Sequence, residues 1–514
     1  MNTETVAKPF QRWSLVVFTV ASALVFLHGL DVPLLGPDEP RYSQVAREMF
    51  TRGDWITPTL GGSQWFEKPA LLYWLQITSY NLFGVSEFSA RFGSAMFGFG
   101  TLLVMFLMAR SWTRRKDAAD STEHFAPVTL YLGASSLGLL VFSRGASFDI
   151  ILTFPMATAL VCYFMQDRIA TSPFARTVYL TGFYFFCGLA LIGKGLIGIV
   201  LPLGIVTMFH LFTRSMPPRR VLVSGIWGLV LSAVTASVWY LPVYMANGWR
   251  FIDEFFVQHH FARYTSNKYL HPQPFWFFWI VLPLMTFPWL PFFIGAVARA
   301  AGRLIHRFRG GESIPGSPLR KFLVAWMLTP LIFFSFSGSK LPGYILPALP
   351  AAILLTAEFL SEYTRQSKRW ASLIPAMSIL TLLAVSAVIA IPLRSWAKHE
   401  TVKDLVEAGN SAGLSEAQII NLHTISHNLE FYGAGRLVRD EDGRQKRFEG
   451  PVEIRIQLER SGADSVLVIV PLEYRTQLEG DTNLKAKFLK DNGELAIFAV
   501  TLAPSASFTG SRSF

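Results

Sequence analysis

Two acidic residues stand side by side at positions 38 and 39, in the stretch "LLGPDEPRYSQVAREM" that directly follows the first apolar segment. Carboxylates exchange protons and stabilise positive charge that develops during a reaction. Charged side chains are costly at membrane depth, so they are functional candidates when they lie there. The alternative is that Asp38 and Glu39 only cap a helix and complement its dipole. The elements that surround the pair therefore matter.

A second charged pair, Glu67 and Lys68, begins the apolar stretch "WFEKPALLYWLQITSYNLFG". Pro40 and Pro69 suit the first turn of a helix, and a glycine ends each pattern, at 53 and 84. The sequence predicts two amphipathic helices that lie along the outer membrane surface, each with a charged pair at its start. In the first helix the apolar stripe is Tyr42, Val45, Ala46, Met49 and Phe50, and Arg41, Gln44, Arg47 and Glu48 fall outside it.

The composition is that of a membrane protein. Of 514 residues, 51% are hydrophobic and only 16% are charged, which predicts a multi-pass chain. The net charge of +11 does not indicate nucleic acid as a partner, because the basic residues fall in short clusters between apolar segments. Cys162 and Cys187 lie inside apolar runs and are predicted to be buried thiols.

A membrane-spanning helix needs about 20 mostly apolar residues. The segments that qualify are 13–30, 88–109, 126–143, 149–165, 177–192, 195–212, 221–243, 275–298, 322–337, 343–361 and 371–392. The first lacks a convincing cleavage site and is expected to stay as a helix. With the N-terminus in the cytoplasm, every inner loop is basic, as the positive-inside rule requires. The long loops 31–87 and 244–274 and the tail 393–514 then lie outside.

The predicted fold is an α-helical polytopic membrane domain, residues 1–392, followed by a small α/β domain, residues 393–514. The tail combines a helical pattern, "VKDLVEAGN", with the strand patterns "SVLVIVPLEY" and "ELAIFAVTL". Its last residues, "APSASFTGSRSF", have little to bury and are expected to be disordered.

Several motifs in this order resemble one known family. They are "GPDEPRYSQVAREM", "WFEKPALLYWLQ", "SEFSARFGSAMFG", "LIGKGLIGIVLP", "HHFARYT" and "SGSKLPGYILPALP", within about residues 10–360. The chain resembles the bacterial aminoarabinose lipid A transferases (ArnT-like), which are related to the protein O-mannosyltransferases and belong to the polytopic C-type glycosyltransferases.

The resemblance implies an inverting transferase of the bacterial inner membrane with its active site facing the periplasm. Its donor would be a sugar on undecaprenyl phosphate, with 4-amino-4-deoxy-L-arabinose as the first candidate. Its acceptor would be lipid A or lipopolysaccharide. The long outer loops 31–87 and 244–274 contain no nucleotide-binding glycine loop and no Asp-any-Asp motif, so a lipid-linked donor fits better than a nucleotide sugar.

The resemblance also suggests the catalytic carboxylates. Asp38 matches the essential acidic residue of the first outer loop, with Glu39 as a supporting neighbour. Asp149, in "SRGASFDI", resembles the second acidic position of the family, and its alternative role is that of a helix N-cap. If the acceptor is a phosphate anion, no strong base is needed and orientation becomes the main role of Asp38.

The phosphate of the carrier calls for cations. Lys68, Arg263 and Lys340 match basic positions that the family places around this phosphate, and Tyr344 matches a hydrogen-bond donor there. As alternatives, Lys340 would snorkel and Tyr344 would belong to the interfacial aromatic belt. Lys194, in "GKG", fits either a lipid head group or a simple tight turn.

A structural divalent metal, zinc by its ligand types, is suggested by the resemblance for Glu67 with His259 or His260. The spacing alone is a weak zinc signal, and a histidine packed against the loop explains the same residues. No other cofactor is required.

Other functions stay open. Within the same enzyme class, the donor sugar would be mannose or galacturonic acid, or the acceptor a protein hydroxyl. A transporter or flippase would favour broken helices, an internal repeat and charges near the midplane, whereas here the unusual charges gather at one face. A catalytically inactive lipid-binding subunit is the last alternative.

Overall fold

The computed structural model describes residues 4–115, 123–261, 272–308, 317–441 and 443–503. The chain forms two compact units. Unit 1 comprises Met1–Leu30, Asp54–Thr57 and Phe66–Val388, and unit 2 comprises Asp31–Gly53, Pro58–Trp65 and Ile389–Phe514. The first outer loop is therefore shared between the units.

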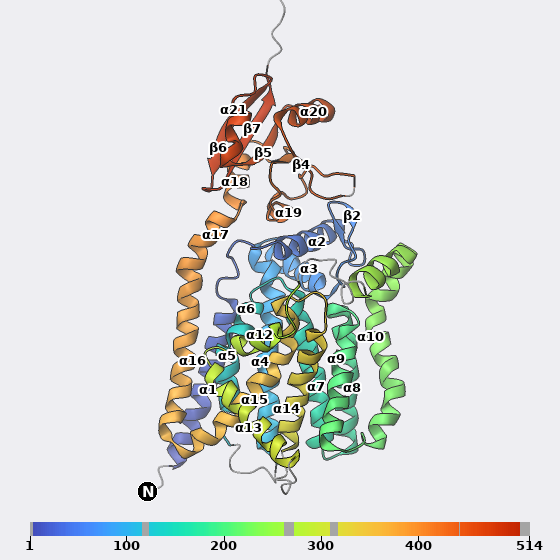
Figure 1. Cartoon of the computed structure of the whole chain (residues 1–514), viewed down its shortest axis with the longest axis vertical. Coiled ribbons are helices and arrows are strands. Elements are labelled where there is room, and N and C mark those ends of the chain that lie inside the picture. Colours follow the sequence, from blue (N-terminus) through green and yellow to red (C-terminus); the bar gives the residue numbers. More distant parts are fainter. Residues whose placement is uncertain (1–3, 116–122, 262–271, 309–316, 442, 504–514) are drawn as a thin grey trace, which may run out of the picture. The chain divides into compact units, whose positions relative to one another are not determined.

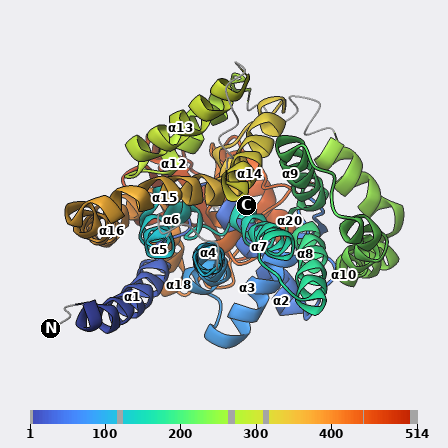
Figure 2. The same cartoon turned by 90° about the horizontal axis from the view of Figure 1, so that it is seen from below.

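Unit 1 is helical (Figures 1 and 2). Its α-helices are α1 (Glu4–Leu27), α3 (Leu71–Phe83), α4 (Glu87–Thr113), α5 (Phe125–Ser135), α6 (Leu137–Phe142), α7 (Phe148–Arg168), α8 (Pro173–Lys194), α9 (Ile197–Thr213), α10 (Arg219–Ile252), α12 (Phe277–Met285), α13 (Leu290–Phe308), α14 (Pro318–Ser335), α15 (Leu349–Gln366) and α16 (Lys368–Val388). A π-helix, η2 (Asp253–Phe261), and a 3₁₀ helix, η3 (Pro342–Ala348), complete it. Helix α7 packs against α4 and α8, as Figure 2 shows.

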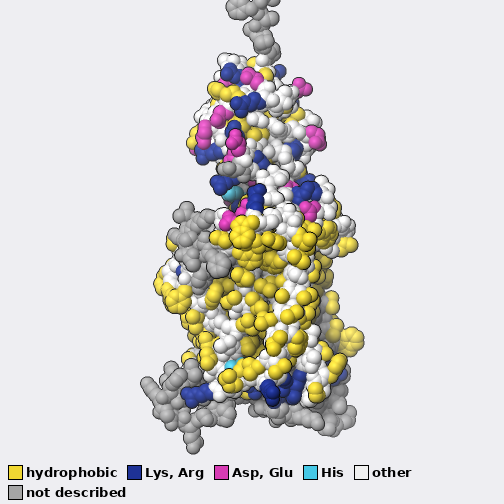
Figure 3. Space-filling model, turned by 90° about the vertical axis from the view of Figure 1, so that its right-hand side faces the viewer, with side chains coloured by type: hydrophobic (Ala, Val, Ile, Leu, Met, Phe, Trp, Pro, Cys, Tyr) yellow, Lys and Arg dark blue, Asp and Glu magenta, His cyan; other side chains and the backbone are white. Residues whose placement is uncertain are grey.

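Within the described residues, seven helices are long and apolar enough to cross a membrane, and four shorter apolar helices accompany them. The shorter ones are Arg12–Leu27, Phe125–Ser135, Ile197–Thr213 and Leu290–Gly302. Each apolar segment expected from the sequence overlaps one of these helices. Figure 3 shows hydrophobic side chains over the helices of unit 1 and Lys and Arg side chains gathered at one end of them. This distribution fits the positive-inside rule, while the number of spans and their orientation stay predictions.

Two of the expected segments are broken, and the breaks stabilise each other. Ser136 is extended and separates α5 from α6, and the segment 275–298 is divided between α12 and α13. The Ser136 hydroxyl donates to the carbonyl oxygen of Met285 at 2.9 Å, and the Leu137 amide donates to that of Phe287 at 2.9 Å. Backbone groups freed inside an apolar bundle need such partners, so one break requires the other.

Unit 2 contains a mixed sheet of strand order β4-β3-β5-β7-β6. The strands are β3 (Ile419–Leu422), β4 (Arg447–Phe448), β5 (Val466–Pro471), β6 (Leu484–Asp491) and β7 (Leu495–Leu502). Strand β3 pairs in parallel with β4 and β5, and β7 pairs antiparallel with β5 and β6. The helical elements from Ile389 onward are η4 (Ile389–Leu393), α17 (Arg394–Glu400), α18 (Lys403–Ser411), α19 (Leu429–Tyr432), α20 (Pro451–Ser461), η5 (Leu472–Tyr474) and α21 (Arg475–Glu479).

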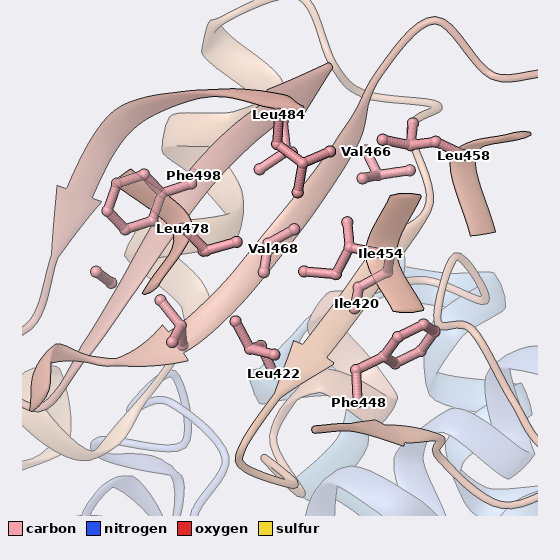
Figure 4. Close-up of a cluster of buried hydrophobic side chains, with 13 residues drawn as sticks. Ile420, Leu422, Phe448, Ile454, Leu458, Val466, Val468, Leu478, Leu484 and Phe498 are labelled. Carbon is pink, nitrogen blue, oxygen red and sulfur yellow. The ribbon is translucent and has the colours of Figure 1, made fainter. Parts of the chain in front are cut away.

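Alternate residues of β5 build two cores. Val466, Val468 and Val470 join a cluster that includes side chains of α20 and α21 (Figure 4). Leu467 and Ile469 point into a second cluster with side chains of α18 and α19. A strand buried on both faces reads as a continuous apolar run because successive side chains face opposite sides. This explains the sequence "VLVIV".

The sheet unit also includes the predicted surface helix, now α2 (Asp38–Arg52), and a hairpin of β1 (Thr59–Leu60) and β2 (Ser63–Gln64). Helix α2 packs on α19. The Leu34 amide donates to the Tyr432 hydroxyl at 2.9 Å, and Arg47 donates to the carbonyl oxygen of Phe431 at 3.3 Å. The predicted division, with loop 31–87 wholly in the membrane domain, therefore differs from the structure. The physical reason is that α2 finds partners in the C-terminal part of the chain.

The apolar stripe of α2 is as predicted, with Tyr42, Val45, Ala46 and Met49 buried. Two residues outside the stripe differ from expectation. Gln44 is only 2% exposed, and Glu48 holds the hairpin. The Thr59 hydroxyl and the Gly61 amide each donate to the Glu48 carboxylate at 2.7 Å, and the Gly62 amide donates at 3.2 Å. Glu48 is thus a structural residue of unit 2.

Replacing Glu48 with alanine removes an acceptor from several donors. Hydrogen bonds to a charged group contribute about 1.5–3 kcal/mol each, and 1.4 kcal/mol corresponds to about tenfold. We expect the Gly61 and Gly62 amides to exchange with deuterium at least about tenfold faster in E48A, measured by hydrogen exchange with mass spectrometry. Glu459, 58% exposed and 3.8 Å from Arg455, is the control, and E459A should leave both amides unchanged. Unchanged exchange in E48A would contradict this role.

Candidate active site

Asp149 lies in the first turn of α7, but it does not cap the helix. The N-cap is Ser147, whose hydroxyl oxygen accepts a hydrogen bond from the Asp149 amide at 3.2 Å. The same hydroxyl donates to the Asp149 carboxylate at 3.1 Å. The alternative of an N-cap role for Asp149 is therefore wrong. Because Ser147 satisfies the helix end, the Asp149 carboxylate is available for other partners.

The partner of Asp149 is Lys194, the last residue of α8. The Lys194 ammonium donates to the Asp149 carboxylate in an ion pair whose two side chains are each 17% exposed. Gly193 brings the helices together, since a Cβ there would lie 3.1 Å from the carbonyl oxygen of Ile151 in α7. Gly195, with φ of +80°, ends α8 directly after the lysine. The motif "GKG" is thus a close helix contact that orients a half-buried cation, and the positive φ at Gly195 favours glycine there.

The 3₁₀ helix η3 completes this cluster. The Lys194 nitrogen lies 4.7 Å from the centre of the Tyr344 ring, within the range of a cation–π contact. A Cβ on Gly343 would overlap the Asp149 carboxylate, so glycine is required at this position. Asp149, Lys194 and Tyr344 come from α7, α8 and η3, and we call them the Asp149 cluster.

Lys340 has a different environment from the one the snorkelling alternative requires. Its side chain is buried, and its ammonium donates to the carbonyl oxygens of Ser337 at 2.6 Å and Gln273 at 3.0 Å. Lys340 therefore joins two loops of unit 1 and does not extend toward solvent. An ammonium has three N–H groups, and the hydrogen bonds to these two carbonyl oxygens use two of them.

Glu67 and Lys68 form an ion pair at 3.0 Å, with side chains 10% and 13% exposed. The residue before them, Phe66, is buried and contacts the ring of Phe251 edge-on, with centroids 5.4 Å apart. Phe251 belongs to α10, which leads into the second outer loop. The charged pair therefore lies where the two predicted outer loops meet.

Aromatic packing and hydrogen bonds join these loops. The Trp239 indole donates to the carbonyl oxygen of Ile56 at 2.9 Å, and the Asn247 amide group donates to the Thr57 hydroxyl at 3.0 Å. Trp239 also contacts the rings of Phe251 and Phe255. These contacts join the two predicted outer loops within unit 1.

The predicted metal ligands are only in part described. The backbone of His259 and His260 continues η2, but their side chains, like all of Arg263, lie outside the described residues. Among the residues that the structure describes, no group of three His, Cys, Asp or Glu side chains is arranged to hold a metal ion. Zinc bound by Glu67, His259 and His260 stays a prediction.

Asp38 and Glu39 begin α2 in unit 2, and they differ in role. Pro37 occupies the N-cap position, and no side chain caps α2 there. The Glu39 carboxylate accepts a hydrogen bond from the Leu35 amide at 3.1 Å. The Asp38 side chain is 53% exposed and lies 3.7 Å from Arg41. The supporting role thus falls to Glu39, and the Asp38 carboxylate is free of capping.

One side chain that interacts electrostatically with Asp38, that of His427, was not predicted from the sequence. His427, between β3 and α19 in unit 2, has a lowered pKa, first because of burial and next because of the positive charge of Arg41. The negative charges of Glu430 and Asp38 oppose this shift of the pKa. His427 therefore shares the electrostatic environment of Asp38 and Arg41. No local pattern reveals this, because the residues are separated by most of the chain.

Known proteins share both sequence and fold with this chain. A family model described as dolichyl-phosphate-mannose-protein mannosyltransferase matches residues 16–257. The undecaprenyl phosphate-alpha-4-amino-4-deoxy-L-arabinose arabinosyl transferase of Aeromonas salmonicida is 31% identical over 390 residues, which are 74% of this chain and 66% of the relative. The protein of the same name from Serratia proteamaculans is 30% identical over 346 residues, 66% of this chain and 58% of the relative.

The fold comparison covers nearly the whole chain. The crystal structure of ArnT from Cupriavidus metallidurans bound to undecaprenyl phosphate matches with a TM-score of 0.74 and 22% identity, over 94% of this chain and 97% of that one. The chain belongs to the aminoarabinose transferase family, which is related to the protein O-mannosyltransferases. Its fold is the mostly helical membrane glycosyltransferase fold of that family.

The sequence match covers only part of the length of the relatives. The chain spans 66%, 58% and 57% of the length of the first three curated relatives that it matches. The family model includes the positions of Asp38, Lys68, Asp149 and Lys194 and ends before Tyr344.

The contact between Gly343 and Asp149 gives a first test of the cluster. In G343A the new methyl group must displace the Asp149 carboxylate or η3, and overpacking of this kind costs about 1–3 kcal/mol. We expect G343A to lower the free energy of unfolding of the detergent-solubilised protein by this amount. Gly225 in α10 has open space where a Cβ would be, so G225A should have no such effect. Equal stability of G343A and G225A would contradict the close contact.

The ion pair gives a second test. Removing one partner of a fully buried pair costs about 3–5 kcal/mol because the other charge stays unpaired, and a pair with side chains 17% exposed should cost less. We expect D149N and K194M each to be destabilised by about 1–3 kcal/mol, and the double variant to recover at least half of the summed loss. The control is Arg394, 42% exposed and paired with Asp31, and R394M should cost less than about 1 kcal/mol. Additive losses in the double variant would show that the two charges do not interact.

Proposed function

We propose that this chain is an inverting glycosyltransferase. It moves a sugar, 4-amino-4-deoxy-L-arabinose as the best candidate, from undecaprenyl phosphate to lipid A or lipopolysaccharide. The observation that supports this function is the similarity to relatives named as undecaprenyl phosphate-aminoarabinose arabinosyl transferases over most of the chain. The proposed location is the bacterial inner membrane, with the active site at the periplasmic face and residues 393–514 on that side.

The proposed reaction is a single displacement at the anomeric carbon. A phosphate oxygen of the acceptor forms the new bond to this carbon as the bond to the carrier phosphate oxygen breaks, and undecaprenyl phosphate leaves with the electron pair. An acceptor that is already an anion needs no deprotonation. The protein must therefore orient the two substrates, neutralise the leaving phosphate and stabilise positive charge on the sugar.

We assign these tasks to the residues in the following way. Asp38, with Glu39 as its support, orients the sugar or stabilises its developing positive charge. The carrier phosphate is bound by four side chains, those of Lys68, Arg263, Lys340 and Tyr344. Asp149 acts through Lys194, because the ion pair fixes the ammonium beside the Tyr344 ring. Each assignment joins the resemblance to a described contact, except that of Arg263, which rests on the resemblance alone.

A second candidate function belongs to the same class. The family model that matches residues 16–257 is described as dolichyl-phosphate-mannose-protein mannosyltransferase. This match favours mannose as an alternative donor sugar and a protein hydroxyl as an alternative acceptor, with galacturonic acid as a further sugar. A hydroxyl acceptor would have to lose a proton, and Asp38 would then act as the base.

The function is tested by mass spectrometry of lipid A. Cells with and without the protein are supplied with one carrier-linked sugar at a time: aminoarabinose, mannose or galacturonic acid. The proposal expects an aminoarabinose adduct on a lipid A phosphate only when protein and donor are both present. An adduct of another sugar, or a glycosylated protein, would support the second candidate. No adduct with any donor would refute both and favour a lipid transporter, which a flipping assay in vesicles would then detect.

Asp38 is the sharpest single-residue test. D38N keeps the size and polarity of the side chain but removes its charge. We expect transfer to fall at least about 100-fold, since charge stabilisation and acid–base steps contribute on this scale. E39Q keeps an acceptor oxygen for the Leu35 amide and should lower transfer less than about threefold. Both variants should appear in the membrane at the level of the unaltered protein. Equal activity of D38N and E39Q would contradict the assignment.

A further inference from the structure

A cavity of about 340 Å³ lies within unit 2. It is formed by α2, α18, the chain before β3, α19 and the chain directly after α19. The side chains that line it are Arg47, Lys403, Val406, Glu407, Asn410, Ser415, Glu416, Phe431, Tyr432, Ala434 and Arg436. Ligand pockets start at about 300 Å³, so the cavity is large enough for a small polar group. None of the proposed catalytic residues lines it.

The lining is mostly polar, which distinguishes the cavity from a packing gap. Gaps that remain between packed elements are apolar and dry. Here three cations and two carboxylates face the same space, together with the side chains of Asn410 and Ser415. Glu407, Asn410, Ser415 and Glu416 are exposed, so a ligand can reach this side of the lining from solvent.

The two arginines are held in place before any ligand arrives. Arg436 donates to the carbonyl oxygens of Ser415 at 2.7 Å, Leu414 at 3.1 Å and Gly433 at 3.1 Å. Arg47 donates to the carbonyl oxygen of Phe431 and lies 5.8 Å from the centre of its ring. Orientation that is fixed in advance lowers the entropy lost on binding. A guanidinium fixed in this way is suited to phosphate oxygens.

The arginines also repel each other. The pKa of Arg436 is lowered, first by burial; the negative charge of Glu416 raises it, and the positive charge of Arg47, a smaller effect, lowers it again. Lys403 adds a third positive charge to the lining. A bound anion would reduce this repulsion, and Coulomb interactions between partly buried groups are only weakly screened.

The other lining groups point to a saccharide attached to the anion. Glu407, Glu416 and Asn410 supply acceptors and donors for hydroxyl groups. Phe431 and Tyr432 offer apolar ring surface with a polar handle on the tyrosine. Convergent polar groups beside aromatic rings are typical of a specific small-ligand site. A bare inorganic anion would use only the cationic part of this lining.

We propose that this cavity is a binding site for a phosphorylated saccharide. The same chemistry occurs in the head group of a membrane glycolipid and in a free sugar phosphate. Identification of this saccharide with the acceptor's head group rests on the proposed function, whereas the binding site itself does not. The C-terminal part of the chain would thus recognise a phosphosugar together with α2.

The experiment measures binding to the full-length protein in lipid nanodiscs by calorimetry. The probes are glucosamine 6-phosphate, glucosamine and inorganic phosphate. We expect glucosamine 6-phosphate to bind at least fivefold more tightly than either of the other two, and its affinity to fall as the salt concentration rises. Equal affinity for glucosamine 6-phosphate and inorganic phosphate, or for glucosamine 6-phosphate and glucosamine, would overturn the proposal.

The variants locate the site. K403Q and R47Q should each lower the affinity for glucosamine 6-phosphate about tenfold. This factor corresponds to about 1.4 kcal/mol, the contribution of one charge-assisted hydrogen bond. Arg436 donates to three carbonyl oxygens, so R436K, which keeps a positively charged donor, is used instead of a neutral variant. Lys485, on the exposed face of β6, is the matched control, and K485Q should bind like the unaltered protein. Unchanged binding in both K403Q and R47Q would overturn the proposal.

Two further measurements separate this inference from the proposed function. D38N should bind glucosamine 6-phosphate normally while transfer is lost. If the unaltered protein binds glucosamine 6-phosphate but transfers no sugar from any donor, the proposed function is refuted and the binding site stands. Competition by vesicles containing lipid A would identify the source as a membrane glycolipid, and competition by the free sugar phosphate alone would identify a soluble source. Either source supports the phosphosugar site.

Discussion

The half-buried ion pair between Asp149 and Lys194 determines how helices α7 and α8 must meet. Each charge stands at the end of a long apolar helix, and each side chain is 17% exposed. Taking either charge from water alone would cost several kcal/mol. The first turn of α7 and the last turn of α8 therefore have to lie together, and Gly193 and Gly343 supply the space for the close approach. The position of Tyr344 beside the ammonium follows from this arrangement.

Local signals were sufficient for the helices, because they act within a few residues. Pro40 and Gly53 mark α2, and Gly84 follows the last residue of α3 directly. The apolar segments likewise predicted where the helices of unit 1 lie. The broken segments at Ser136 and after Met285 were not predictable in this way, since each break is stabilised by hydrogen bonds to the other. Such a dependence between distant segments leaves no mark in either stretch of sequence.

The sequence indicated which residues belong to the candidate site, but it indicated less well which residues they contact. Asp149 was a catalytic candidate with a helix N-cap as its alternative role, and only the geometry shows that Ser147 is the cap, because both residues are good capping residues. For Lys194 a lipid head group and a tight turn stayed open, because its ion pair depends on the packing of α7 on α8. The amphipathic pattern of α2 predicted a buried face and could not tell a membrane surface from a protein surface. The structure assigns that face to unit 2.

The ion pair also bears on how a cation is kept ready for a phosphate. An ammonium placed alone among apolar helices would be costly, because a charge is poorly solvated there. The Asp149 carboxylate pairs with the ammonium of Lys194, and the Tyr344 ring adds a second favourable contact. An ammonium has three donors, so one bond to Asp149 leaves others for a phosphate oxygen. When an anion binds, Lys194 therefore need not give up Asp149. The pair can serve substrate binding and helix packing at the same time, which is why Gly343, although chemically inert, belongs to the same arrangement.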